Sequence, residues 1–505
     1  MKSSARLLLS LVPFLALAVV LRAGTADKSY REARQVLETG LKAMGGVDAL
    51  KAIKGVRRTG NATVYAQGQS RLPDGPPDAR QVELVSTVDF AGGHSRTETT
   101  TSGSGILTTR TRTVVNGEKS FNYNLVTRVL TATSANGVTA ARTAMRRDHA
   151  ALLLTALSRA ETLRTLGEDI LDGKRQRVVT FSDTDGAQIA LHFDAASGLL
   201  SKTETLADNA AMGDTLTETL LSEYRDVPAG AVAVRLPARV VTRVAGTVTQ
   251  DMKYAAIEAN AALSEDLLAE PKDAIKVPPA PPAAGVAATA LGDHSYFLGG
   301  GSHHSLAVGF ADHVVVVEAP LNDDRSLAVL AKVAELFPGK PVRYVVPTHF
   351  HFDHSGGLRT YVAKGITILT TLGNKAMIER MSAAPHTIRP DSLSREPKKP
   401  VVETFTGKKV LSDGTRTLEL YDVGPNPHVT EAVVAYLPAA KGLFVSDLIT
   451  IPLAGPWPPA SPALVDFADK IRKLGLAVET IAPGHGRLGT MEDLKAALAA
   501  KPAQE

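Results

Sequence analysis

Cysteine is absent from the 505 residues of this chain. Its absence excludes disulfides, thiolate catalysis, iron–sulfur clusters and cysteine-ligated zinc. Any metal ion that the protein binds must therefore be held by His, Asp or Glu side chains.

A large excess of one charge is also absent. The net charge is +4 at pH 7, and charged residues make up 21% of the chain. The densest basic segment, residues 395–399, is typical of a solvated loop. Because nucleic-acid binding usually shows as a concentrated basic stripe, we expect no nucleic-acid partner. Neither a serine-centred nucleophile elbow nor a Walker phosphate loop occurs in the sequence.

Only the first residues form a long apolar run. Lys2 and Arg6 precede the apolar residues 7–21, and the small residues 24–26 follow them. This pattern predicts a signal peptide over residues 1–26 and a periplasmic or secreted protein, with an uncleaved anchor as the alternative. No later run is long and apolar enough for a membrane span, so we expect no integral membrane protein once the signal is removed.

Four potential metal ligands lie within six residues, at His349, His351, Asp353 and His354. The chain has only 13 His residues, so three of them at this spacing, with an Asp between, are not expected by chance. Six residues cannot easily wrap all four groups around one tetrahedral ion. A turn can aim the first two at one ion and the last two at its neighbour, which predicts a two-metal hydrolytic site.

Three further residues occupy similar positions in the chain. Each follows a short apolar run that predicts a buried strand, as residues 342–346 do before His349. Ligands of α/β proteins usually lie at the carboxyl ends of such strands. We therefore expect these residues to join the four at one edge of a sheet: His428, Asp447 and His485.

This ordered set resembles the metallo-β-lactamase-fold hydrolases over about residues 290–500. The resemblance implies an α/β domain, an αββα sandwich, with two zinc ions at one edge. It implies a bridging hydroxide that attacks an ester, lactone, thioester, phosphodiester or lactam bond of a small-molecule substrate. Asp353 would also be catalytic, by orienting the nucleophile and passing on its proton. The implied ligands are His349, His351 and His428 for the first zinc, Asp353, His354 and His485 for the second, and Asp447 for both.

Two features distinguish among members of this fold. The absence of cysteine excludes the lactamase subclass with a cysteine zinc ligand, and other lactamases generally lack a bridging residue such as Asp447. The pattern therefore favours ester, lactone, thioester or phosphodiester hydrolysis. Two alternatives are a mononuclear iron oxidoreductase of the same fold, similar to persulfide dioxygenases, and a non-catalytic periplasmic binding protein.

The first half of the chain has a different pattern. Alternating apolar and polar residues with Asn-Gly and Asp-Gly turns predict an antiparallel β-rich domain over residues 28–268, with helices near 30–44 and 139–157. A Pro/Ala-rich linker follows at residues 269–287, and the hydrolase domain spans 288–505. The β-rich domain resembles periplasmic lipoprotein carriers, which implies contact with lipid or a partner protein. The alternative is a scaffold. His303 and His304 border the active-site mouth or lie in a turn.

Overall fold

The computed structural model describes residues 24–103, 107–277 and 285–500. The predicted signal peptide falls almost entirely outside these residues, and helix α1 (Thr25–Ala43) begins at its last positions. Within the described ranges, none of the helices combines the length and the apolar character that a membrane crossing requires.

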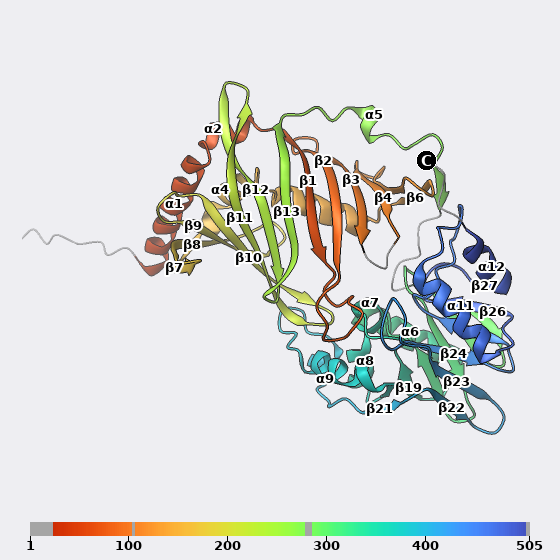
Figure 1. Ribbon diagram of the computed structural model, residues 1–505. Helices are drawn as coiled ribbons and strands as arrows, with labels where there is room; N and C mark the ends of the chain where they lie inside the picture. Colours follow the sequence, from red (N-terminus) through yellow and green to blue (C-terminus); the bar gives the residue numbers. More distant parts are fainter. Residues whose placement is uncertain (1–23, 104–106, 278–284, 501–505) are drawn as a thin grey trace, which may run out of the picture.

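The N-terminal half forms one curved sheet of 14 strands (Figure 1). Neighbouring strands are antiparallel, except that the short strand β14 runs parallel to β6. The strands of this sheet, in the order in which they are hydrogen-bonded, are β14 (Ile275–Val277), β6 (Val129–Ala132), β5 (Phe121–Asn124), β4 (Thr109–Val115), β3 (His94–Gly103), β2 (Ala79–Asp89), β1 (Gly55–Tyr65), β13 (Thr247–Ala259), β12 (Val232–Val244), β11 (Gly213–Ala229), β10 (Leu200–Asn209), β9 (Gln188–Asp194), β8 (Lys174–Ser182) and β7 (Arg164–Leu171).

Turn residues explain the tight connections of this sheet. Asp172 and Gly173 join β7 to β8 and have φ angles of 49° and 76°. Positive φ at both central residues is the geometry of the hairpin turn that Asp-Gly favours. The Asn116-Gly117 and Asp185-Gly186 turns likewise lie between consecutive strands, β4–β5 and β8–β9.

Helices cover part of the sheet. Leu37 and Leu41 of α1 and Leu153 of α4 (Leu152–Ser158) share one buried cluster with Phe181 and Leu191 of the sheet. The short helices α2 (Val47–Ala52), η1 (Ala160–Thr162) and α5 (Glu265–Leu268) also belong to this half.

The helix expected over residues 139–157 is two helices, α3 (Ala135–Arg146) and α4. Asp148 interrupts it, because its carboxylate accepts hydrogen bonds from the backbone N–H of Ala150 and from Arg58 in β1. A side chain that bonds nearby backbone groups competes with helix continuation.

The C-terminal half contains two sheets of seven and six strands. The first is β15 (Ala287–Gly292), β16 (Ser295–Gly299), β17 (Ser305–Gly309), β18 (Val314–Val317), β19 (Val342–Val346), β20 (Thr367–Thr371) and β21 (Val402–Phe405). The second is β22 (Lys408–Ser412), β23 (Thr417–Asp422), β24 (Val433–Leu437), β25 (Gly442–Val445), β26 (Thr480–Pro483) and β27 (Gly489–Thr490). The helices are α6 (Asp323–Leu336), α7 (Phe352–Ser355), α8 (Leu358–Ala363), η2 (Leu372–Asn374), α9 (Lys375–Ala383), α10 (Ser392–Arg395), α11 (Pro462–Leu474) and α12 (Met491–Ala499).

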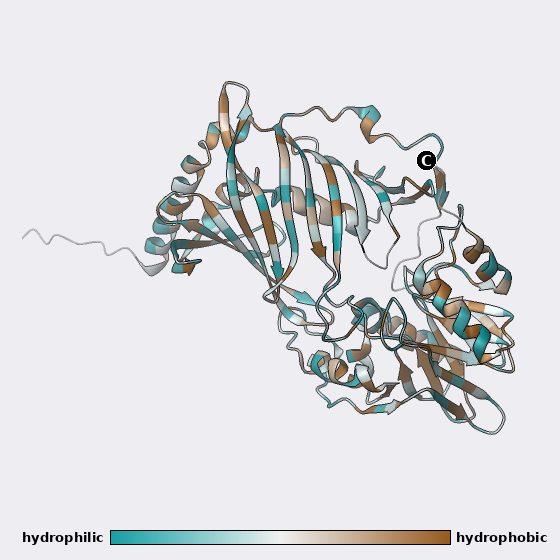
Figure 2. Cartoon of the chain, viewed as in Figure 1, coloured by the Kyte–Doolittle hydropathy of each residue, from teal (hydrophilic) through white to brown (hydrophobic). Residues whose placement is uncertain are grey.

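Three buried clusters define the layers of this half. Val315 and Val317 of the first sheet pack against Leu420 and Phe444 of the second. The other face of the first sheet packs on α6 and α8, and that of the second on α11 and α12. The strands are accordingly apolar along most of their length (Figure 2). The expected αββα sandwich, preceded by a β-rich domain, is confirmed.

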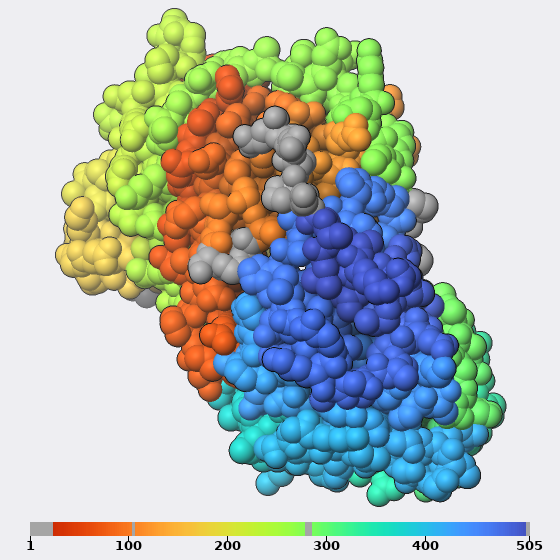
Figure 3. All heavy atoms as spheres, turned by 45° about the vertical axis from the view of Figure 1, so that its right-hand side comes forward, coloured from red at the N-terminus to blue at the C-terminus, as the bar shows by residue number. Residues whose placement is uncertain are grey.

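The two halves contact each other directly, as the adjoining orange and blue atoms in Figure 3 show. The carboxylate of Asp214 in β11 accepts hydrogen bonds from the backbone N–H groups of Thr387 and Ile388. His386 Nδ1 lies 2.7 Å from Asp208 Oδ1 in β10. Part of the predicted linker, β14, belongs to the N-terminal sheet. The exact domain limits stay a prediction.

Candidate metal centre

The strand ends of the two C-terminal sheets bring the predicted residues together. His349 follows β19, and α7 carries Asp353 and His354 directly after His351. His428 follows β23, while Asp447 and His485 each lie two residues beyond the ends of β25 and β26. All seven predicted residues therefore meet at one edge of the sandwich.

They form two groups in which each residue offers one ligand atom and these atoms lie within 4.8 Å of one another. The first group contains His349, His351, His428 and Asp447. The second group contains Asp353, His354 and His485, as predicted, together with His303.

The carboxylate of Asp447 lies between the two groups. Its Oδ2 atom is 3.2 Å from His428 Nε2 and 3.7 Å from His349 Nε2. Its Oδ1 atom is 3.0 Å from His354 Nε2 and 2.9 Å from His485 Nε2. One oxygen thus faces each group, which is the arrangement that a bridging carboxylate requires.

Several atoms at the centre lack the partners that buried polar groups usually have. His351 Nδ1 is buried and has no hydrogen-bond partner among the described residues. The Nε2 atoms of His349 and His428 face each other at 3.3 Å, and so do those of His354 and His485. Imidazole nitrogens and carboxylate oxygens that converge in this way fit zinc or a similar cation.

The far sides of three of these rings contact a second partner. His351 Nε2 donates to the backbone oxygen of Ser70 at 3.0 Å, and His485 Nδ1 donates to that of Ser302 at 2.8 Å. Thr348 Oγ1 lies 3.0 Å from His349 Nδ1. Partners of this kind set the tautomer and orientation of a ligating imidazole.

Glu318 fixes the ring of His354. This carboxylate is fully buried directly after β18, with Oε2 2.8 Å from His354 Nδ1 and Oε1 accepting the backbone N–H of Thr348 at 2.8 Å. Its φ of 77° lies in the left-handed region, which is uncommon for a residue other than glycine and is often found at functional sites. Since both oxygens are occupied, Glu318 supports the centre rather than completing it.

Burial and neighbouring carboxylates shift the pKa values of the histidines at the centre in opposite directions. Burial lowers the pKa of His349 well below its usual value and the pKa of His351 to about 4, so both rings are neutral at pH 7. Burial opposes charge on His354 as well, but the carboxylates of Asp447 and Glu318 raise its pKa well above the usual value. A metal ion would compete with that proton, because metal ligands must be deprotonated.

His303 was predicted only to border the site or to lie in a turn. Its Nε2 atom lies 3.2 Å from Asp353 Oδ2, and its ring centroid is 4.2 Å from that of His485. The residue follows β16 on a glycine-containing loop, where the sequence shows no spacing typical of metal ligands. Only the tertiary structure places it in the second group.

One family model and several solved structures are similar to part of this chain. The model of the metallo-beta-lactamase superfamily matches residues 298–485. Solved structures that match include a metallo-beta-lactamase from Pontibacter korlensis, with 22% identity over 43% of this chain and 98% of that one, at a TM-score of 0.34. The metallo-beta-lactamase DIM-1 matches with 18% identity, 43% and 96% coverage and a TM-score of 0.33. FIM-1 from Pseudomonas aeruginosa, in its mono-zinc form, matches with 19% identity, 42% and 92% coverage and a TM-score of 0.32. The family-model match over residues 298–485 confirms the resemblance predicted from the motif.

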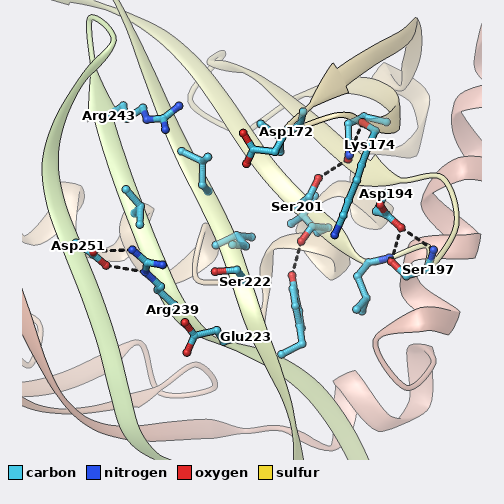
Figure 4. Close-up of a pocket in the computed structure, with 18 of the residues that line it drawn as sticks. Asp172, Lys174, Asp194, Ser197, Ser201, Ser222, Glu223, Arg239, Arg243 and Asp251 are labelled. Atoms are coloured by element: carbon cyan, nitrogen blue, oxygen red, sulfur yellow. Dashed lines mark hydrogen bonds and ion pairs between the residues drawn. The ribbon is translucent and has the colours of Figure 1, made fainter.

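A separate cavity of about 710 Å³ lies on the N-terminal sheet (Figure 4). Arg239 and Asp251 form a two-bond ion pair on one side of it, at 3.0 and 2.8 Å, and Lys174 and Asp172 lie on the other. Leu221 is among the apolar residues that line the cavity. Charged side chains distinguish this cavity from an apolar cup, and its lining includes none of the seven predicted metal residues.

Proposed function

We propose that the protein is a zinc-dependent hydrolase with two metal ions per chain. The position of Asp447, with one oxygen toward each group of ligand atoms, is the observation that carries this proposal. His349, His351 and His428 would hold the first ion, Asp353, His354 and His485 the second, and Asp447 both.

The donor set explains the choice of zinc. All donors are imidazole nitrogens or carboxylate oxygens, which suit zinc, and the chain offers no thiolate. Bound ions of this kind supply a Lewis acid and lower the pKa of water to about 7.

The residues of the chain have their own part in the reaction. Asp353 is the more accessible carboxylate of the centre, with 23% of its side chain exposed, and its Oδ2 atom faces His303. Burial raises the pKa of Asp353, but hydrogen bonding to His303 and the charge of His354 hold it well below its usual value. The group is therefore ionised at neutral pH and suited to orient an attacking water molecule and accept its proton.

The bonds that such a site would cleave are ester, lactone, thioester, phosphodiester or lactam bonds of small molecules. Export to the periplasm or beyond the cell rests on residues 1–26 alone. A contact of the N-terminal domain with lipid or a partner protein rests on its resemblance to carriers.

Metal content and a hydrolysis screen test the proposal together. We expect two zinc ions per chain in purified protein, and hydrolysis of at least one substrate among lactones, β-lactams, aryl esters, thioesters and phosphodiesters. His351→Ala should abolish that hydrolysis, whereas His94→Ala, in β3, should leave it unchanged. One iron per chain would indicate the oxidoreductase instead, and activities that survive His351→Ala would refute the hydrolase.

A further inference from the structure

The loop between β1 and β2, residues 66–78, extends from the N-terminal sheet into the metal centre. Figure 1 shows this β1–β2 loop in orange-red directly beside α7. The backbone oxygen of Gly68 accepts a hydrogen bond from Phe352 N at 3.4 Å. The loop therefore touches the helix that carries Asp353 and His354.

Ser70 fixes one residue of the first group. Its backbone oxygen accepts the hydrogen bond from His351 Nε2, and the residue is only 4% exposed. Since a carbonyl can only accept, Nε2 must carry the proton and Nδ1 must carry the lone pair. Nδ1 is buried and has no partner in the described part of the chain, so this hydrogen bond leaves it free to bind a metal ion.

Gln69 fixes one residue of the second group. Its Nε2 atom donates to Asp353 Oδ1 at 2.5 Å. The other oxygen of Asp353, Oδ2, then faces His303 Nε2 at 3.2 Å and His354 Nε2 at 3.6 Å. The Gln69 amide thus determines which carboxylate oxygen of Asp353 is directed into the second group.

Arg71 attaches the same loop to the opposite side of the centre. Its Nε donates to the backbone oxygen of Asn426 at 2.9 Å, and its backbone oxygen accepts from Thr430 N at 3.0 Å. Asn426 in turn accepts the backbone N–H of His428 at 2.8 Å. The loop is therefore held on both sides of the two groups.

From these contacts we infer that Gln69 and Ser70 of the N-terminal domain are positioning residues of the metal centre in the C-terminal domain. The inference rests on the metal binding proposed above and deepens it, because the N-terminal domain becomes part of the site. Groups that orient metal ligands commonly change metal affinity 10- to 100-fold when they are removed.

Zinc affinity of the full-length protein, measured by chelator competition, tests this role without using activity. Gln69→Leu keeps the size of the side chain but removes the donor to Asp353. We expect one zinc-binding step to weaken about ten-fold or more and the other to remain near its wild-type value. The absorption spectrum of the cobalt-substituted protein should change as well, since it reports the ligand geometry.

Gln67→Leu is the matched control, because Gln67 lies in the same loop but donates to Val244 O in β12 at 3.3 Å. It should bind zinc as the wild type does. Gln69→Asn, whose amide is one carbon too short to reach, should behave as Gln69→Leu and replaces it if the leucine variant does not fold.

Three results separate the possible failures. Unchanged zinc affinity and cobalt spectrum in both Gln69 variants would overturn the positioning role. Equal weakening in the Gln67 and Gln69 variants would also overturn it, by showing a general effect of the loop on folding. Wild-type protein that binds no metal would refute the proposed function itself.

Discussion

Replacing Glu318 by Gln converts one buried carboxylate into an amide and keeps the shape of the side chain. In the native protein its two oxygens accept from Thr348 N and face His354 Nδ1, each at 2.8 Å. A glutamine has one oxygen and one NH₂ group, so it can accept from one of these donors while its own donor faces the other. One buried N–H therefore loses its carboxylate acceptor, at a cost of about 1–3 kcal/mol, and His354 Nδ1 then has only Ser446 Oγ, at 2.9 Å, in its place.

That cost falls on zinc binding if His354 is the donor that loses the carboxylate, because the ring is then held less firmly with Nε2 toward Asp447. A free energy of about 1–3 kcal/mol corresponds to a loss of roughly 5- to 150-fold in affinity. We expect this loss in the binding step that involves His354, measured by chelator competition. Urea unfolding of metal-free protein would report any general loss of stability separately.

Glu335→Gln is the matched control, since this carboxylate lies on α6 with 65% of its side chain exposed. It should leave both zinc-binding steps unchanged. If Glu318→Gln also bound two zinc ions with wild-type affinity, the argument that Glu318 orients His354 would be wrong.

Two further predictions concern folding, and one concerns zinc binding. Arg58→Met should destabilise the protein by about 3 kcal/mol in urea unfolding, because it leaves the mostly buried carboxylate of Asp148 without its ion pair. The two hydrogen bonds of that pair are 2.7 and 2.8 Å long. The control Arg57→Met breaks an exposed ion pair and should cost less than about 1 kcal/mol. Burial raises the pKa of Asp148, but Arg58 lowers it below the usual value, so this stabilisation is present above about pH 4 and is lost as the pH falls through the folded-state pKa. The difference in stability between the wild type and Arg58→Met should therefore shrink as the pH falls through the folded-state pKa of Asp148, in a series of urea midpoints. Gly486→Ala should weaken zinc binding, because Gly486 is next to His485, has a φ of 91°, and would place its added Cβ 1.9 Å from the backbone oxygen of Ile451. The clash should displace His485. Wild-type zinc affinity in that variant would contradict this displacement.

Sequence patterns predicted the architecture where a pattern has one structural meaning. Apolar runs such as 342–346 predicted buried strands, and the residues that follow them met at one edge because parallel strands end on the same side. Alternating residues with Asp-Gly turns predicted the antiparallel domain, and its hairpins formed at those turns. The same patterns did not predict that the 14 strands form a single sheet, since pairing partners far apart in sequence leave no local signal.

Local competition explains the error in the helix over residues 139–157. The apolar spacing there suits one helix, and nothing in that segment indicates that Asp148 pairs with Arg58, 90 residues away. A tertiary contact therefore decided a local structure that periodicity alone assigned differently.

The candidate metal centre also contains residues that the sequence reveals by their chemistry and groups that it does not reveal. Ligands must be imidazoles or carboxylates, so their residue types and spacing are visible in the sequence. The partners that orient them include the backbone oxygens of Ser70 and Ser302, which any residue type could supply. Ser70 also lies 281 residues from the histidine that it holds. A search for motifs therefore finds the ligands of such a site, whereas its dependence on a second domain follows only from the three-dimensional contacts.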